Sequence, residues 1–181
     1  MNSHYLEEII LVRPAFDDWA ALAECPERGC EGLGAMCGEC GDAVRQCAAE
    51  VLQSVKTGKV LDGTWSRYLA LDKASSQVVG FCRFAGLPDE SGAVEIMCTT
   101  FPRFEGLGCG TLMAKELIAF ATSFRRIKKV VAHTDENNEA ACQVLRRLGF
   151  ENCGLQSDEE ATARLRWEFY CNGRELISPE T

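Results

Sequence analysis

The stretch GAVEIMCTTFPRFEGLGCGTLMAKELIAFATSF, residues 92–124, decides the fold. Residues 93–101 mix β-branched and apolar side chains, which is typical of a strand. Pro102 ends that strand because proline cannot donate to a ladder. Three glycines follow at alternate positions, and from Thr111 onward apolar residues recur at helical spacing. The stretch therefore predicts a strand, a glycine-rich turn and a helix.

The glycine-rich turn is a candidate anion site. Its glycines permit positive φ and a close approach to the backbone. The first turn of the helix offers unpaired amides and the positive end of the helix dipole, and both favour phosphate. A dinucleotide fingerprint does not fit because Thr111 stands where its last glycine belongs, and no lysine follows Gly110 as a Walker A loop requires. A tight turn without a ligand is the remaining alternative.

Two ordered segments resemble a known family. PRFEGLGCG, residues 102–110, resembles the pyrophosphate-binding signature of the GNAT superfamily of N-acetyltransferases, in which Gln or Arg precedes G-x-G or G-x-A. NEAACQVLRRLGF, residues 138–150, resembles a second family segment, N-x-x-A/S followed by an apolar helix and Gly-Phe. The resemblance covers about residues 9–170. Within the superfamily, residues 95–121 look closest to the bacterial group similar to ribosomal-protein N-terminal acetyltransferases.

The resemblance implies a mixed α/β (α+β) fold. A central, mostly antiparallel sheet would contain one parallel pair of strands that splay apart, and helices would flank the sheet. Hydropathy patterns place the other strands near residues 7–12, 65–71, 78–85, 127–133, 150–155 and 163–170, and the other helices at 16–23 and 42–56. The strand at 127–133 follows a helical crossover and should be parallel to the one before it. Asn138 should cap the next helix, Gly149 should end it, and SDEE at 157–160 should form an acidic turn.

Bulk composition narrows the class of protein. A chain of 181 residues is expected to form one domain, 1–181. Its net charge of −8 argues against a nucleic-acid partner and favours cationic partners. No apolar run is long enough to span a bilayer, so we expect no membrane partner. The first residues, MNSHYLEE, do not resemble a secretory signal, and the eleven cysteines are odd in number. We therefore expect reduced thiols in a cytoplasmic protein. The sequence leaves the oligomeric state open.

The segment Cys25–Gly41, CPERGCEGLGAMCGECG, shows no hydrophobic period and is expected to be an inserted, flexible, cysteine-rich loop with free thiols. Four thiolates can bind zinc, but the first pair is separated by four residues and the gap between pairs is short for a zinc ribbon. We therefore expect no metal. In the family this connection often lies over the acceptor pocket, which implies a role in substrate selection.

By resemblance, acetyl-CoA is the cosubstrate. Its pyrophosphate would lie on the amides of residues 106–111, and its pantetheine arm would pair with strand backbone near Cys98 and Thr100. Asn138 would contact that arm, although a plain helix cap explains it equally well. The family's Gln or Arg is replaced here by Glu105. The predicted cofactor-binding residues are Cys98, Thr100, Glu105, Gly106, Leu107, Gly108, Cys109, Gly110, Thr111 and Asn138.

In the implied reaction a primary amine attacks the thioester of acetyl-CoA directly. The amine belongs to a small molecule or to a protein. Because such amines are mostly protonated at neutral pH, a base is needed. Glu95 occupies the place where many family members keep a catalytic glutamate, with a structural carboxylate as its alternative. His133 is a second candidate for proton transfer, although a histidine at a strand end is more often structural. Leu145 occupies the position of the family's usual tyrosine acid.

Two other functions remain open. Glu105 and Leu145 depart from the family pattern, which motivates a non-catalytic domain that binds or senses acyl-CoA. The cysteines between Cys25 and Cys40 motivate a thiol- or zinc-based module. Cys98 and Cys109 are not expected to act as nucleophiles, because no histidine partner is recognisable and the family needs no covalent step.

Overall fold

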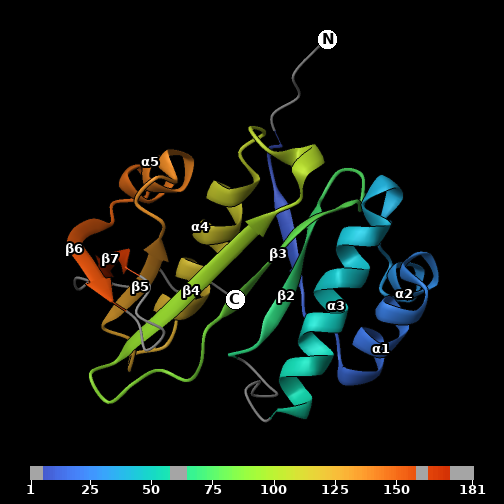
Figure 1. The fold of residues 1–181 in the computed structure, drawn as a ribbon, viewed down its shortest axis with the longest axis horizontal. Coiled ribbons are helices and arrows are strands. Elements are labelled where there is room, and N and C mark those ends of the chain that lie inside the picture. The colour runs from blue at the N-terminus through green and yellow to red at the C-terminus, as the bar shows by residue number, and fades with distance from the viewer. Residues whose placement is uncertain (1–5, 58–64, 158–162, 172–181) are drawn as a thin grey trace, which may run out of the picture.

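The computed structural model describes residues 6–57, 65–157 and 163–171. Its described strands form one mixed sheet in the order β1-β2-β3-β4-β5-β7-β6 (Figure 1). The strands are β1 (Ile9–Val12), β2 (Arg67–Asp72), β3 (Val78–Phe84), β4 (Ala93–Thr100), β5 (Lys129–Thr134), β6 (Glu151–Ser157) and β7 (Ala163–Tyr170). All but one of the strand pairs are antiparallel, and the parallel pair joins β4 to β5. The predicted fold class is thus confirmed.

The parallel pair is short and then separates. Ala93, Val94 and Glu95 of β4 pair with residues 129–131 of β5, and no pairing follows beyond Glu95 and Val131. Residues 96–100 of β4 keep β3 as a partner on one edge, while residues 132–134 of β5 pair only with β7. The sheet therefore opens into a fork between β4 and β5, beyond residue 95.

Helices cover both faces of the sheet (Figure 1). On one face lie α1 (Phe16–Glu24), α2 (Pro26–Gly32) and α3 (Gly41–Lys56), and on the other lie α4 (Cys109–Thr122) and α5 (Glu139–Arg147). Short 3₁₀ turns, η1 (Gly38–Cys40) and η2 (Pro102–Phe104), precede α3 and α4. The turn at 157–160 expected from the sequence lies almost wholly outside the described residues.

Strand alternation assigns side chains to the two faces. Phe84 of β3 contacts Phe120 of α4 with ring centroids 5.9 Å apart, so Phe84 and its partner Ile96 face α4. Arg67 of β2 donates to Ser54 of α3 at 3.4 Å. The side chains that alternate with those facing α4 therefore lie on the α3 face of the sheet. By this alternation, Glu95 lies on the α3 face of the sheet.

An aromatic cluster anchors α4 to the sheet. Trp65 packs against Phe84 and Phe124 with centroid separations of 4.9 and 5.1 Å, and Tyr68 lies 6.2 Å from Phe120. Such edge-on and tilted contacts are favourable geometries for aromatic rings. The helix that carries the glycine-rich turn at its beginning is therefore held firmly against β3 and β4.

The prediction of a loop over Cys25–Gly41 was wrong for much of that segment. Pro26–Gly32 forms α2, and Cys30, Cys37 and Cys40 are buried in the core. The pattern was missed because this helix buries small residues instead of large apolar ones. A Cβ atom at Gly29 would lie 2.8 Å from the backbone of Leu22, so only glycine lets α2 approach α1 so closely.

The described helices include none that is both long and apolar enough to cross a bilayer. The predicted ends of other elements differ by a few residues. In particular, α4 begins at Cys109, two residues before Thr111, from which the sequence pattern predicts the helix. The N-cap at Asn138 is confirmed, and Gly149 with φ of 85° follows the last helical turn of α5 as predicted.

Candidate active site

The glycine-rich turn leads directly into α4. The first bond along this helix runs from the amide of Leu112 to the carbonyl of Gly108 at 3.1 Å, so the amides of residues 109–111 have no intrahelical acceptor. They mark the positive end of a helix of 14 residues. This geometry suits an anionic group.

Backbone conformation explains two of the three glycines. Gly106 and Gly108 have φ of 76° and 87°, where other residues are strained. A Cβ atom at either position would meet no atom within 4 Å, so packing does not require glycine there. The open space in front of the helix end can receive a phosphate. Gly110 differs, since it lies within α4 and a Cβ there would make ordinary contact with Thr100 at 3.6 Å.

The predicted residues around the turn differ in exposure. Cys109 is buried, its thiol donates to the carbonyl of Phe104 at 3.5 Å, and burial raises its pKa to about 11. That thiol is therefore a poor nucleophile near neutral pH. Glu105 is exposed, whereas Leu107 and Thr111 are half-buried. The turn thus offers backbone amides and one exposed carboxylate.

The fork supplies the second part of the site. Between residues 96 and 100, β4 has a free backbone edge facing β5, which an amide-containing chain could pair with as an added strand would. The side chains of Cys98 and Thr100 point to the α4 face; Thr100 lies beside Gly110, and Cys98 lies opposite the buried Cys82. Only their backbone groups can therefore play the predicted part in the pairing.

Asn138 and Leu145 belong to α5. The side-chain oxygen of Asn138 accepts a hydrogen bond from the amide of Ala141 at 3.0 Å, which is a helix cap. The Asn138 residue is otherwise exposed, and its contact with a cofactor stays a prediction. Leu145 is buried, so this position holds an apolar core residue in place of a proton donor.

Glu95 and His133 meet across the fork. Nδ1 of His133 on β5 lies 2.9 Å from Oε1 of Glu95 on β4. His133 lies two residues beyond Val131, the last residue of β5 that pairs with β4, and reaches back to the carboxylate. The Glu95 side chain is 35% exposed and that of His133 is 22% exposed. The structure thus joins the two residues that the sequence named separately as candidates for proton transfer.

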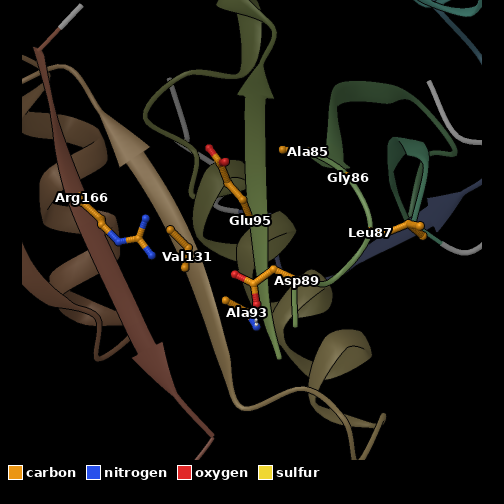
Figure 2. A pocket seen from close by; sticks show the side chains of 8 residues that line it. All are labelled: Ala85, Gly86, Leu87, Asp89, Ala93, Glu95, Val131 and Arg166. Atoms are coloured by element: carbon orange, nitrogen blue, oxygen red, sulfur yellow. Dashed lines mark hydrogen bonds between the residues drawn. The ribbon is translucent and has the colours of Figure 1, made fainter. Parts of the chain in front are cut away.

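A hollow of about 220 Å³ lies next to Glu95 (Figure 2). Its lining comes from the loop after β3 and from β4, β5 and β7: Ala85, Gly86, Leu87, Asp89, Ala93, Glu95, Val131 and Arg166. Figure 2 shows Arg166 reaching from β7 toward Val131, while Asp89 lies on the other side of Val131. Asp89 accepts hydrogen bonds from Ser91 and from the amide of Ala93, which lower its pKa.

Sequence reasoning missed the buried carboxylate of Glu168, which orients Arg166. Lys129, Arg166 and Tyr170 all donate to it, at 2.8, 2.8 and 2.6 Å. The hydrogen bond from Lys129, followed by those from Tyr170 and Arg166, lowers the pKa of Glu168 to about 2. The sequence did carry a signal for this cluster. Strand alternation puts three charged residues on one face of β7, namely Arg164, Arg166 and Glu168.

The cysteines form no evident metal centre. Within residues 6–57, 65–157 and 163–171, no group of three or more His, Cys, Asp or Glu could hold a metal ion. Burial raises the pKa of Cys30 and Cys47 to about 12, and it also raises the pKa of Cys37 and Cys40. All described cysteines are free thiols. The environments of Cys30, Cys37, Cys40 and Cys47 are those of inert core residues.

Comparison with known families agrees with this architecture. The model of the acetyltransferase (GNAT) domain matches residues 9–151, which is well over half of the chain. The chain therefore belongs to the GNAT acetyltransferase family. Acetyltransferases of this family use acetyl-CoA.

Individual relatives are distant. The chain is 26% identical over 106 residues to the uncharacterised N-acetyltransferase p20 of Bacillus licheniformis, covering 58% of this chain and 60% of p20. The match thus spans about three-fifths of that curated relative. The ribosomal-protein-S5-alanine acetyltransferase from Vibrio fischeri has a similar structure, with a TM-score of 0.62 and 13% identity over 92% of this chain and 95% of that one.

The microcin C7 self-immunity acetyltransferase MccE, solved in complex with acetyl-CoA and AMP, is similar at a TM-score of 0.60 and 16% identity. The similarity covers 94% of this chain and 97% of MccE. At these identities both solved structures show a likeness of fold alone.

Proposed function

We propose that this protein transfers the acetyl group of acetyl-CoA to a primary amine by direct attack, at the fork between β4 and β5. The observation that carries the proposal is the position of Glu95. It is the last residue of β4 that pairs with β5, it lines the hollow, and the free edge of β4 begins immediately after it. A carboxylate therefore lies where a cofactor arm and an acceptor would meet.

The cofactor would bind along the free edge of β4 and the start of α4. The unpaired amides of residues 109–111 and the open space at Gly106 and Gly108 suit a pyrophosphate. The free backbone edge near residues 98 and 100 suits the amides of the pantetheine arm. The exposed carboxylate of Glu105 would repel the phosphates, so the amides and the helix dipole must supply the attraction.

The acceptor would enter through the hollow on the α3 face. Glu95 and Asp89 present carboxylates there, where the cation of the lining, Arg166, is already paired with Glu168, and the chain as a whole carries a net charge of −8. Both features favour an amine that arrives as a cation. The acceptor class we propose is a primary amine of a small molecule or of a protein.

The carboxylate of Glu95 favours loss of a proton from this amine at the fork. Once neutral, the amine nitrogen attacks the thioester carbon, the new C–N bond forms, and the C–S bond breaks with its electron pair on sulfur. The remaining extra proton on nitrogen passes to the departing thiolate. A thiol of ordinary acidity leaves without an added acid near neutral pH, which is compatible with a buried Leu145 at the family's tyrosine position.

A domain that binds acyl-CoA without catalysis is the second candidate, because Glu105 and Leu145 both depart from the family pattern. Incubation with acetyl-CoA and a panel of amines separates the two. The panel would include spermidine, glycinamide and short peptides with free N-termini. Mass spectrometry of the amines is the suitable readout, since thiol reagents would also react with the protein's own cysteines. We expect enzyme-dependent acetylation of at least one amine. Binding of acetyl-CoA with no acetylated product across the panel would favour the sensing domain.

A further inference from the structure

The contact between Glu95 and His133 allows a more specific assignment, which rests on the proposed acetyl transfer. We propose that Nε2 of His133 accepts the proton from the acceptor amine, and that Glu95 acts through His133 as the residue that orients the imidazole. The pair then forms a carboxylate–imidazole unit at the fork, in place of a glutamate that touches the amine directly.

The contact between Glu95 and His133 fixes which atom donates and which accepts. An ionised carboxylate can only accept, so the 2.9 Å contact with Oε1 of Glu95 requires the proton of a neutral imidazole to be on Nδ1. Nε2 of His133 is then the nitrogen with the free lone pair. No partner for Nε2 is found among the residues that the structure describes. The pairing thus selects the tautomer that leaves a base available.

The other charges on this face contact a different carboxylate, Glu168. Lys129 of β5 and Arg166 of β7 are the neighbouring cations, and both are engaged by Glu168. Arg166 lies directly opposite His133 in the register of β5 and β7. Because Glu168 also accepts from Tyr170, its oxygens are occupied, and Glu95 is the carboxylate that contacts His133. The two systems of polar contacts are separate.

Ordered strands hold both residues of the pair in place. Thr134, next to His133, accepts a hydrogen bond from Nε1 of the buried Trp167 at 2.9 Å and lies 3.5 Å from the thiol of Cys142 on α5. These contacts fix the end of β5 between β7 and α5. Glu95 is fixed in turn by the β4–β5 pairing. A base held by ordered strands on both sides is suited to proton transfer.

The acceptor nitrogen loses two protons during the transfer. The acceptor ammonium gives one proton to Nε2, which converts the imidazole to imidazolium beside the carboxylate of Glu95. The neutral amine attacks the thioester, nitrogen gains carbon, and sulfur leaves with the C–S electron pair. The second proton on nitrogen goes to that thiolate to give free CoA, and the imidazolium later returns its proton to solvent.

Two variants distinguish this assignment from a glutamate base. His133→Asn keeps a donor for Glu95 but lacks Nε2, and we expect its kcat on an amine acetylated by the wild type to fall about 100-fold. Glu95→Gln keeps an acceptor for the ring, and we expect only about a tenfold loss. The reverse order, with Glu95→Gln far more damaged than His133→Asn, would overturn the assignment.

Three readouts separate catalysis from a structural role. Acetyl-CoA binding should be unchanged in both variants, the acidic limb of the pH–rate profile should vanish in His133→Asn, and added imidazole should restore activity to His133→Ala. An unchanged acidic limb and no rescue would contradict the proposal. If the wild type acetylates no amine in the panel, the proposed function fails.

The pairing itself can be tested without activity. The chain has two histidines, His4 and His133, so nitrogen NMR of the full-length protein gives two imidazoles, and His133→Asn assigns them. We expect neutral His133 to carry its proton on Nδ1, and to lose that preference in Glu95→Ala. A proton on Nε2 in the wild type would rule out the proposed base, whatever the acceptor.

Discussion

Replacing Glu168 with Gln removes the charge that Lys129, Arg166 and Tyr170 share. The Glu168 side chain is only 7% exposed, and those of Lys129 and Arg166 are 24% and 23% exposed, so water replaces the lost charge poorly. Loss of one partner from a largely buried ion pair is strongly destabilising. We expect Glu168→Gln to lower the free energy of unfolding and to release Arg166 from its position at the hollow.

The size of this effect follows from the pKa of Glu168. Its hydrogen bonds lower that pKa from 4.5 to about 2. One pKa unit corresponds to about 1.4 kcal/mol, so the ionised form contributes about 3 kcal/mol at pH 7. Because the folded-state pKa is depressed, this stability is present above pH 4.5 and is lost as the pH falls toward 2. At pH 3 only about 1 kcal/mol should remain.

Urea denaturation of the wild type and of Glu168→Gln between pH 7 and pH 3 measures the difference directly. The matched control is Glu8→Gln, since Glu8 contacts Lys73 at the same 2.8 Å but with exposed side chains. We expect Glu8→Gln to change stability by less than about 0.5 kcal/mol. The reasoning is refuted if Glu168→Gln costs no more than the control, or if its cost does not shrink as the pH falls.

Three further predictions concern packing, thiol reactivity and the α5 cap. Gly29→Ala should lower the free energy of unfolding by about 1–3 kcal/mol in thermal or urea unfolding, because the new Cβ would meet backbone of α1. At Gly32→Ala the new Cβ has nothing within 4 Å, so this variant should be nearly neutral. Equal effects of the two substitutions would contradict the close packing. Iodoacetamide at pH 7.5 should label exposed Cys153 before buried Cys47, whose pKa is about 12. Peptide mapping would show the order of labelling, and early labelling of Cys47 would argue against the described core. Asn138→Ala should cost about 1 kcal/mol of stability while Asn138→Ser keeps the cap, and weaker acetyl-CoA binding in both would reveal a cofactor contact.

The sequence predicted the elements whose patterns are local. The strand, glycine-rich turn and helix over residues 92–124 combine proline, glycine and apolar periodicity, and each of these acts within a few residues. The cap at Asn138 was predicted correctly for the same reason, whereas the parallel direction of β5 followed from the helical crossover that precedes it.

Features that depend on tertiary packing were predicted less well. The sequence predicts a loop where the helix Pro26–Gly32 forms, because the buried face of this helix consists of proline, glycine and cysteine. The packing of this helix depends on its close contact with α1. The Glu168 cluster joins residues of β5 and β7 that lie 39 positions apart. The contact between Glu95 and His133 spans 38 positions and follows from sheet register alone. Candidate residues could be named from the sequence, but their partners could not.

We expect acetyl-CoA to bind at the start of α4. The most direct test is calorimetric titration of acetyl-CoA into the wild type, Gly108→Glu and Gly154→Glu. Gly108 and Gly154 have φ of 87° and 88° and open space around them, so both substitutions add the same charge and similar backbone strain. Only Gly108 lies at the proposed phosphate site, since Gly154 is on the edge strand β6.

A carboxylate about 4–5 Å from a phosphate costs roughly 3–4 kcal/mol at an effective dielectric constant of 20. We therefore predict that Gly108→Glu weakens binding at least about 100-fold while Gly154→Glu binds like the wild type. Equal binding by all three proteins, or no binding by the wild type, would contradict the account.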